Sequence, residues 1–150
     1  PHSNWGLKNR ARKIYAVDTG EGQLAEEIKN NPKVLDMSKT NFLTLEKEKI
    51  TDVDFVVIDV SFVSLTKLIP VLASDFDKVK IVALIKPQFE CGLEYARKHK
   101  GIVKDEKMHE KIIKNIAENF EKNGFKNNGI IVSPIKGGDG NTEFLIFVEK

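Results

Sequence analysis

Residues 79–92 read VKIVALIKPQFECG, and they give the clearest indication of the fold class. The apolar run from Ile81 to Ile85 is too short for an ordinary helix and is typical of a strand covered on both faces. Pro87 lacks an amide donor and favours an extended Lys86, so the strand is predicted to end there. Lys86 would then lie at the carboxyl end of a parallel strand, where α/β sheets bind ligands. Taken alone, such a lysine is more often a surface residue whose ammonium reaches water.

The composition is that of an ordinary globular protein of one domain. The 150 residues are 31% charged and 41% hydrophobic, and the net charge of +2 does not by itself indicate nucleic-acid binding. No apolar run reaches the roughly 18 residues of a membrane span, and no signal-peptide core is present, so no membrane partner is predicted. One cysteine and three dispersed histidines predict a reducing, cytoplasmic location and no metal site.

Strand-like and helix-like segments alternate along the rest of the chain. Apolar runs predict strands at 13–18, 34–37, 55–60, 129–135 and 142–148, and helical spacing predicts helices at 22–31, at 65–72 after a serine cap, and at 106–123. The glycine-bracketed stretch 92–101 is predicted to be a loop, and Pro70 to kink its helix or delay its start. Residues 136–141 are too few for a crossover helix, so the last two strands should be antiparallel. This order predicts an α/β fold with a mostly parallel sheet and an antiparallel C-terminal hairpin.

Acidic side chains accompany three of these strands. Asp18 and Asp59 lie where two parallel strands end, and Glu143 begins the last strand. If that strand is reversed, its start lies at the same edge as the other ends, so Asp18, Asp59, Lys86 and Glu143 are expected to converge. An Asp before a glycine-containing turn is typical of a residue that binds ribose hydroxyls, but it is also a common helix-initiating residue.

Four motifs in sequence order carry a family resemblance: KIYAVDTGEGQLA, DFVVIDVSFVSL, ALIKPQFECG with GIVKD after it, and GNTEFLIF. Together they resemble the class I S-adenosylmethionine-dependent methyltransferases of the FtsJ type, most closely the TlyA branch, often labelled haemolysin A. The resemblance implies a Rossmann-like fold and methylation of ribosomal RNA at ribose 2′-hydroxyls. By motif position it implies Asp59, Lys86 and Glu143 as catalytic residues, and Asp18, Asn41 and Asp59 as residues that bind S-adenosylmethionine.

The amino-terminal side departs from the family pattern. Neither the glycine-rich cofactor loop nor the family's first catalytic lysine precedes KIYAVD. Residues 1–150 are therefore predicted to form a single, partial methyltransferase domain that lacks the first strand, with residues 1–10 as an arm or linker. The resemblance also implies an S4-type RNA-binding domain upstream in the full-length protein, and ribosomal RNA or a ribosomal subunit as partner. A second copy of the chain could complete the sheet, which would make the protein a homo-oligomer.

Two other interpretations remain open from the sequence. The chain could be a catalytically inactive RNA-binding module that retains the methyltransferase fold, with basic residues at 10–13 and 97–100 contacting phosphates. A nicotinamide-dependent enzyme is the weakest alternative, because no G-x-G-x-x-G motif opens the chain.

Overall fold

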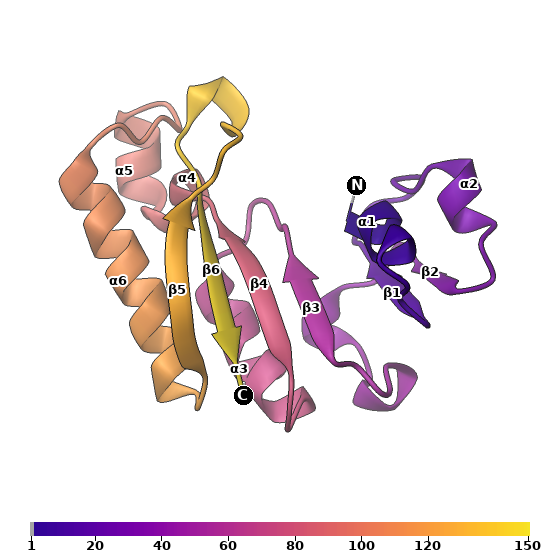
Figure 1. Ribbon diagram of the computed structural model, residues 1–150. Helices are drawn as coiled ribbons and strands as arrows, with labels where there is room; N and C mark the ends of the chain where they lie inside the picture. The colour runs from indigo at the N-terminus through magenta and orange to yellow at the C-terminus, as the bar shows by residue number, and fades with distance from the viewer. Residues whose placement is uncertain (1) are drawn as a thin grey trace. The chain divides into compact units, whose positions relative to one another are not determined.

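The computed structural model describes residues 2–150, which form two compact units (Figure 1). The first unit ends at Asp52 and contains α1 (His2–Lys8), β1 (Ile14–Val17), α2 (Glu26–Lys29) and β2 (Val34–Met37), followed by the single-turn 3-10 helices η1 (Phe42–Thr44) and η2 (Lys47–Lys49). β1 and β2 pair in parallel, with Ile14 opposite Val34 and Val17 opposite Met37. Both strands lie where the apolar runs predicted them.

α2 is shorter than the helix expected over 22–31. The chain before it is held in a turn, because the Gly20 amide donates to Asp18 Oδ1 at 2.7 Å and Gly22 has a φ of +69°. A positive φ is incompatible with a right-handed helix, so the helix begins only after Ala25.

The second unit, Val53–Lys150, is built around a four-stranded sheet. Its strands are β3 (Phe55–Ile58), β4 (Lys80–Ile85), β5 (Lys126–Val132) and β6 (Phe144–Glu149), arranged in the order β3-β4-β6-β5. β3 and β4 are parallel, whereas β6 runs antiparallel to both of its neighbours. The α/β class and the antiparallel hairpin predicted from the sequence are confirmed.

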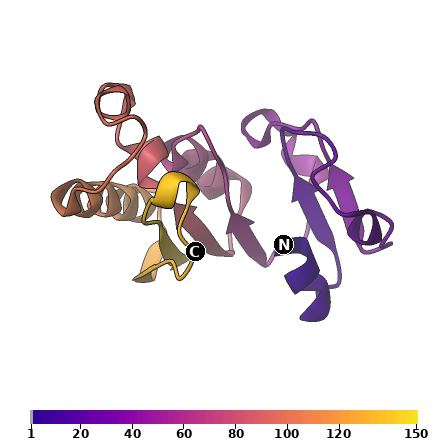
Figure 2. The same cartoon turned by 90° about the horizontal axis from the view of Figure 1, so that it is seen from above.

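Helices α3 (Leu65–Asp75) and α6 (Glu106–Lys122) pack against each other and cover one face of this sheet (Figures 1 and 2). Their apolar stripes meet alternate residues of the two inner strands to form the core: Leu65, Leu68, Ile69 and Leu72 of α3, Ile112, Ile116 and Phe120 of α6, Ile81, Ala83 and Ile85 of β4, and Phe144, Ile146 and Val148 of β6. This packing fixes the carboxyl end of β4 and the start of β6, where Lys86 and Glu143 lie.

The two main helices begin at side-chain caps. The Ser64 hydroxyl accepts from the Thr66 amide, and Asp105 Oδ1 accepts from the Lys107 amide at 3.0 Å. The cap satisfies one of the first amides of α3, which starts at Leu65, directly after Ser64, and continues through Pro70 to Asp75.

The expected loop at 92–101 is also wrong. Residues 87–90 form the short helix α4 (Pro87–Glu90), and α5 (Leu93–Lys98) lies between the two glycines. Gly92 and Gly101 have φ values of +84° and +74°, and the Gly101 amide donates to the Ala96 carbonyl at 2.8 Å. These glycines therefore delimit a helix, as glycine does at helix ends.

Candidate active site

Lys86 lies at the point where β4 ends and α4 begins. Its Nζ is 2.7 Å from Asp59 Oδ1 and donates to Ser61 Oγ at 3.2 Å. The Lys86 side chain is 14% exposed and that of Asp59 is 39% exposed, so the ammonium is sheltered while the carboxylate that it contacts is open to solvent. Asp59 follows β3, and the parallel β3–β4 pairing places the two strand ends side by side. The prediction that Lys86 and Asp59 meet at one edge agrees with this contact.

Glu143 reaches the same edge from the reversed strand. Ile85 of β4 pairs with Phe144 of β6 in an antiparallel register, so Lys86 and Glu143 both lie just beyond that pair, at the same edge of the sheet. Glu143 is 6% exposed, and its Oε1 accepts a hydrogen bond from Gln88 Nε2 at 2.9 Å. Among residues 2–150 no ion pair joins Glu143 to Lys86 directly. Glu143 is therefore linked to the lysine segment through Gln88.

Glu90 on α4, the helix after Lys86, is hydrogen-bonded to the start of α3, the helix after Asp59. Its carboxylate accepts from the Leu65 amide at 2.8 Å and from the Ser64 hydroxyl, and so closes the start of α3 against α4. Burial raises the pKa of Glu90 above its usual 4.5, and the two hydrogen bonds partly offset that rise.

An aromatic pair flanks this edge. Phe62 follows Ser61, has a φ of +63° and is 90% exposed, and its ring centroid lies 4.8 Å from that of Phe89 on α4. A large apolar side chain so exposed is unusual, and an aromatic face beside the ion pair suits stacking against an unpaired base.

The two other predicted site residues lie in the first unit, in the loops that follow β1 and β2. Asp18 follows β1 and accepts from the Gly20 amide, while Asn41 Oδ1 accepts from the Leu43 amide and caps η1. The two loops are joined by backbone hydrogen bonds from Lys39 to Gly20 and from Thr40 to Asp18.

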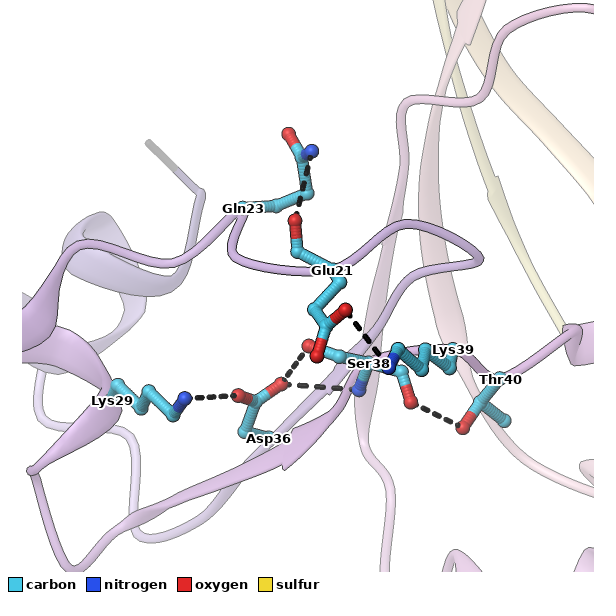
Figure 3. Close-up of polar contacts among 7 residues, drawn as sticks. All are labelled: Glu21, Gln23, Lys29, Asp36, Ser38, Lys39 and Thr40. Carbon is cyan, nitrogen blue, oxygen red and sulfur yellow. Dashed lines mark hydrogen bonds and ion pairs between the residues drawn. The ribbon is translucent and has the colours of Figure 1, made fainter.

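Side-chain contacts reinforce these loops (Figure 3). Lys39 Nζ lies 2.8 Å from Glu21 Oε2, and Lys29 Nζ lies 3.8 Å from Asp36 Oδ2. Asp36 also accepts from the Ser38 amide at 3.1 Å and from its hydroxyl. The first unit thus presents Asp18 and Asn41 from a pair of mutually bonded loops.

Neither a metal site nor a membrane-spanning helix is found among residues 2–150. No group of three or more His, Cys, Asp or Glu side chains there could hold a metal ion. None of the helices in the same range has the length and apolarity needed to cross a membrane.

Residues 3–150 match the family described as FtsJ-like methyltransferase. The chain belongs to this family. Within it, the chain is 41% identical to YqxC of Bacillus subtilis over 143 residues, which cover 93% of this chain and 50% of YqxC. It is 34% identical to the 16S/23S rRNA (cytidine-2′-O)-methyltransferase TlyA of Mycobacterium tuberculosis, over 95% of this chain and 53% of TlyA.

A solved structure agrees with these relatives. A protein from Streptococcus thermophilus, described as a hemolysin, superposes with a TM-score of 0.93 at 39% identity, covering 99% of this chain and 55% of that chain. The chain spans about half the length of the relatives it matches. These likenesses confirm the FtsJ-like, TlyA-type resemblance and the methyltransferase fold that the motifs indicated.

Sequence reasoning located Asp59, Lys86 and Glu143 but missed three residues beside them: Gln88, Glu90 and Gly137. Gln88 and Glu90 stand in the motif that follows Lys86, and Gly137 stands in the loop before Glu143. Polar residues directly after a predicted catalytic lysine, in a segment too short to be a long helix, were the available signal for the first two.

Proposed function

We propose that the protein transfers a methyl group from S-adenosylmethionine to a ribose 2′-hydroxyl of ribosomal RNA, with Lys86, Asp59 and Glu143 as its catalytic residues. The observation that carries the proposal is the 2.7 Å ion pair between Lys86 and Asp59 at the carboxyl end of β4. Membership of the FtsJ-like family and the name of the relative TlyA support the reaction type.

A ribose hydroxyl is a poor nucleophile, so a base must take its proton as the methyl group is transferred. A neutral lysine amine has two N–H donors and one lone pair. Asp59 and Ser61 lie 2.7 and 3.2 Å from Lys86 Nζ and accept both donors, which leaves the lone pair for the hydroxyl proton. Once protonated, Lys86 is an ammonium beside the Asp59 carboxylate, so the charge that forms is balanced within the site.

Glu143 adds a second carboxylate on the opposite side of Lys86. Its position beside the Ile85–Phe144 pair and its burial put its charge in a poorly solvated place at the same edge of the sheet as Lys86. In the proposed reaction Glu143 stabilises the ammonium that forms on Lys86 and does not accept the proton itself.

The cofactor residues fit a nucleoside. S-adenosylmethionine, when bound, supplies the methyl group from a sulfonium centre. Asp18 uses one carboxylate oxygen for the Gly20 amide, so the other can accept from a ribose hydroxyl. A side chain at Gly20 would bring its Cβ to 3.1 Å from that carboxylate, so glycine keeps the approach to Asp18 open. By motif position, Asn41 would lie near the adenine, and Asp59 would contact the cofactor as well as Lys86.

The test is methyl transfer in the natural full-length protein with labelled S-adenosylmethionine and ribosomal RNA. Lys86→Ala should lower kcat by about 10²–10⁴-fold, the usual contribution of a general base. Lys80→Ala is the matched control, because Lys80 lies at the opposite, exposed end of the same strand. Undiminished methylation by Lys86→Ala would overturn the catalytic assignment.

The same assay separates the enzyme from an RNA-binding module. A wild-type protein that binds RNA with strong salt dependence but does not bind S-adenosylmethionine would overturn the enzymatic proposal. We also propose, on the TlyA-type resemblance, that an S4-type RNA-binding domain delivers the ribosomal RNA to this domain in the full-length protein. Removal of such a domain should weaken RNA binding more than cofactor binding.

A further inference from the structure

The carboxylate of Glu143 lies in a closely fitted setting that the proposed reaction does not by itself explain. Glu143 is 6% exposed, and its Oε1 accepts from Gln88 Nε2 at 2.9 Å. Gln88 belongs to α4, which begins directly after Lys86. One short helix therefore connects the lysine to the side chain that holds the glutamate.

The orientation of the Gln88 amide follows from the charge of its partner. An ionised carboxylate only accepts hydrogen bonds, so the NH2 end of the amide must face Glu143. The other end, Gln88 Oε1, is then buried without a hydrogen-bond partner among residues 2–150. A buried acceptor without a partner lowers stability, so the amide is held in place at a cost. This cost is understandable if fixing Glu143 is important to the protein.

Gly137 completes the setting from the other side. A Cβ built on Gly137 would lie 2.1 Å from Glu143 Oε1 and 2.6 Å from its Cδ, distances at which the carboxylate must move. The φ of Gly137 is −77°, so backbone conformation does not require glycine there. Space for the carboxylate is what requires it. The next residue, Gly138, has no heavy atom within 4 Å of a built Cβ and is a natural comparison.

The loop that carries Gly137 is itself held firmly. Asn141 is 3% exposed, its Oδ1 accepts from the Val103 amide at 2.9 Å, and its Nδ2 donates to the Gly101 carbonyl at 3.0 Å. The Gly137 amide donates to the Asn141 carbonyl at 2.8 Å. The backbone at Gly137 therefore cannot easily withdraw to make room for a larger side chain.

We propose that Gln88 and Gly137 are positioning residues that act on the reaction through Glu143. Gln88 holds the carboxylate by a hydrogen bond, and Gly137 leaves the space that the carboxylate occupies. The inference rests on the proposed function, since a fixed Glu143 matters for rate only if Lys86 and Glu143 take part in methyl transfer.

The first test removes the hydrogen bond while keeping side-chain length. In the natural full-length protein, Gln88→Met should lower kcat about 10- to 100-fold, which is the loss expected for a hydrogen bond to a charged group. The Kd for S-adenosylmethionine and the thermal unfolding midpoint should stay close to wild type. A kcat within twofold of wild type would overturn the role of Gln88.

The second test compares neighbouring glycines. Gly137→Ala should lower kcat by a similar factor because it displaces the Glu143 carboxylate, whereas Gly138→Ala should leave kcat unchanged. Equal losses in the two variants would overturn the role of Gly137 and indicate a general effect on the loop. Should Gly137→Ala fold poorly, the Gln88→Met comparison still decides the proposal.

The third test asks whether both residues act through one carboxylate. In a Glu143→Ala background, Gln88→Met should cause no further loss of kcat, since the group that it positions is gone. Additive losses would show that Gln88 acts elsewhere. Failure of the proposed function is distinguishable from these outcomes, because it would appear as a wild-type protein without methyl transfer.

Discussion

The two units differ in what holds their functional residues in place. In the first unit Val34 is the one buried hydrophobic side chain among the described residues, and the sheet has two strands. The second unit contains all the other buried hydrophobic residues and a four-stranded sheet covered by two helices. Asp18 and Asn41 therefore depend on local loop contacts, whereas Asp59, Lys86 and Glu143 are anchored to a core. Two strands alone are marginally stable. The first unit, which carries the proposed cofactor residues Asp18 and Asn41, should therefore have the lower local stability.

The largest effect should come from the core of the second unit. Phe120 on α6 is fully buried and packs edge-on against Phe125 at 5.4 Å. Phe120→Ala should lower the free energy of unfolding by about 3–5 kcal/mol. Leu35→Ala on β2, where the side chain is 45% exposed, should change it by no more than about 0.5 kcal/mol. Urea denaturation of both variants measures the difference, and similar losses would contradict the contrast between the units.

Hydrogen exchange should reveal the same contrast in the unaltered protein. Amides in the β4–β6 ladder, such as Ala83 and Ile146, should exchange at least about 100-fold more slowly than those of β1 and β2, such as Tyr15 and Leu35. The reason is that opening the central sheet exposes buried side chains, whereas opening the two-stranded sheet exposes few. Equal protection in both sheets would show that the first unit is as rigid as the second.

The contact between Glu90 and the start of α3 should make the second unit sensitive to pH. Burial raises the folded-state pKa of Glu90, so its contribution favours folding most when the carboxyl is protonated and is lost as the pH rises through that pKa. Relative to Glu90→Gln, the wild type should therefore become more stable as the pH falls from neutral toward 4.5. Denaturation midpoints of the two proteins over this range test the sign, and a constant difference would contradict it.

The smallest effect is a titration in the first unit. Hydrogen bonding, from Lys13 above all and from Thr51, lowers the pKa of Tyr15 to about 8. The other tyrosine, Tyr95, has its pKa raised above 10, chiefly by desolvation. Absorbance at about 295 nm should therefore rise in two separate steps. Lys13→Ala should move the first step toward pH 10, and an unmoved step would show that Lys13 is not the main cause.

The sequence was most informative where a charged residue or a proline ends an apolar strand. The run before Lys86-Pro87 and the residues before Asp59 located the ends of β4 and β3, so their meeting could be expected from parallel pairing alone. The register of the hairpin likewise brought Glu143 to the same edge. Gly92 and Gly101 misled because glycine is common both in loops and at helix ends, and spacing alone does not separate the two.

Gln88 and Gly137 could not be predicted as partners of Glu143. Gln88 lies 55 residues before Glu143 in the sequence, yet its Nε2 is 2.9 Å from Glu143 Oε1. Gly137 lies in the loop before Glu143, and its role depends on the 2.1 Å that would separate a Cβ there from the same oxygen. Such distances follow from packing, not from periodicity. The exposure of Phe62 could not be predicted either, because its apolar character favours burial, whereas in the structure the residue has a positive φ and is exposed.

The place of β6 in the sheet has a consequence for the protein while it is being synthesised. β6 is translated after β3, β4 and β5, yet it lies between β4 and β5. Until it leaves the ribosome, β4 lacks its antiparallel neighbour and β5 has no strand to pair with. A nascent chain that has emerged only as far as β5 therefore carries unpaired strand edges of the kind that chaperones protect. Glu143 directly precedes β6. The four-stranded sheet and the edge that carries Lys86 and Glu143 should therefore be completed in the same step of synthesis.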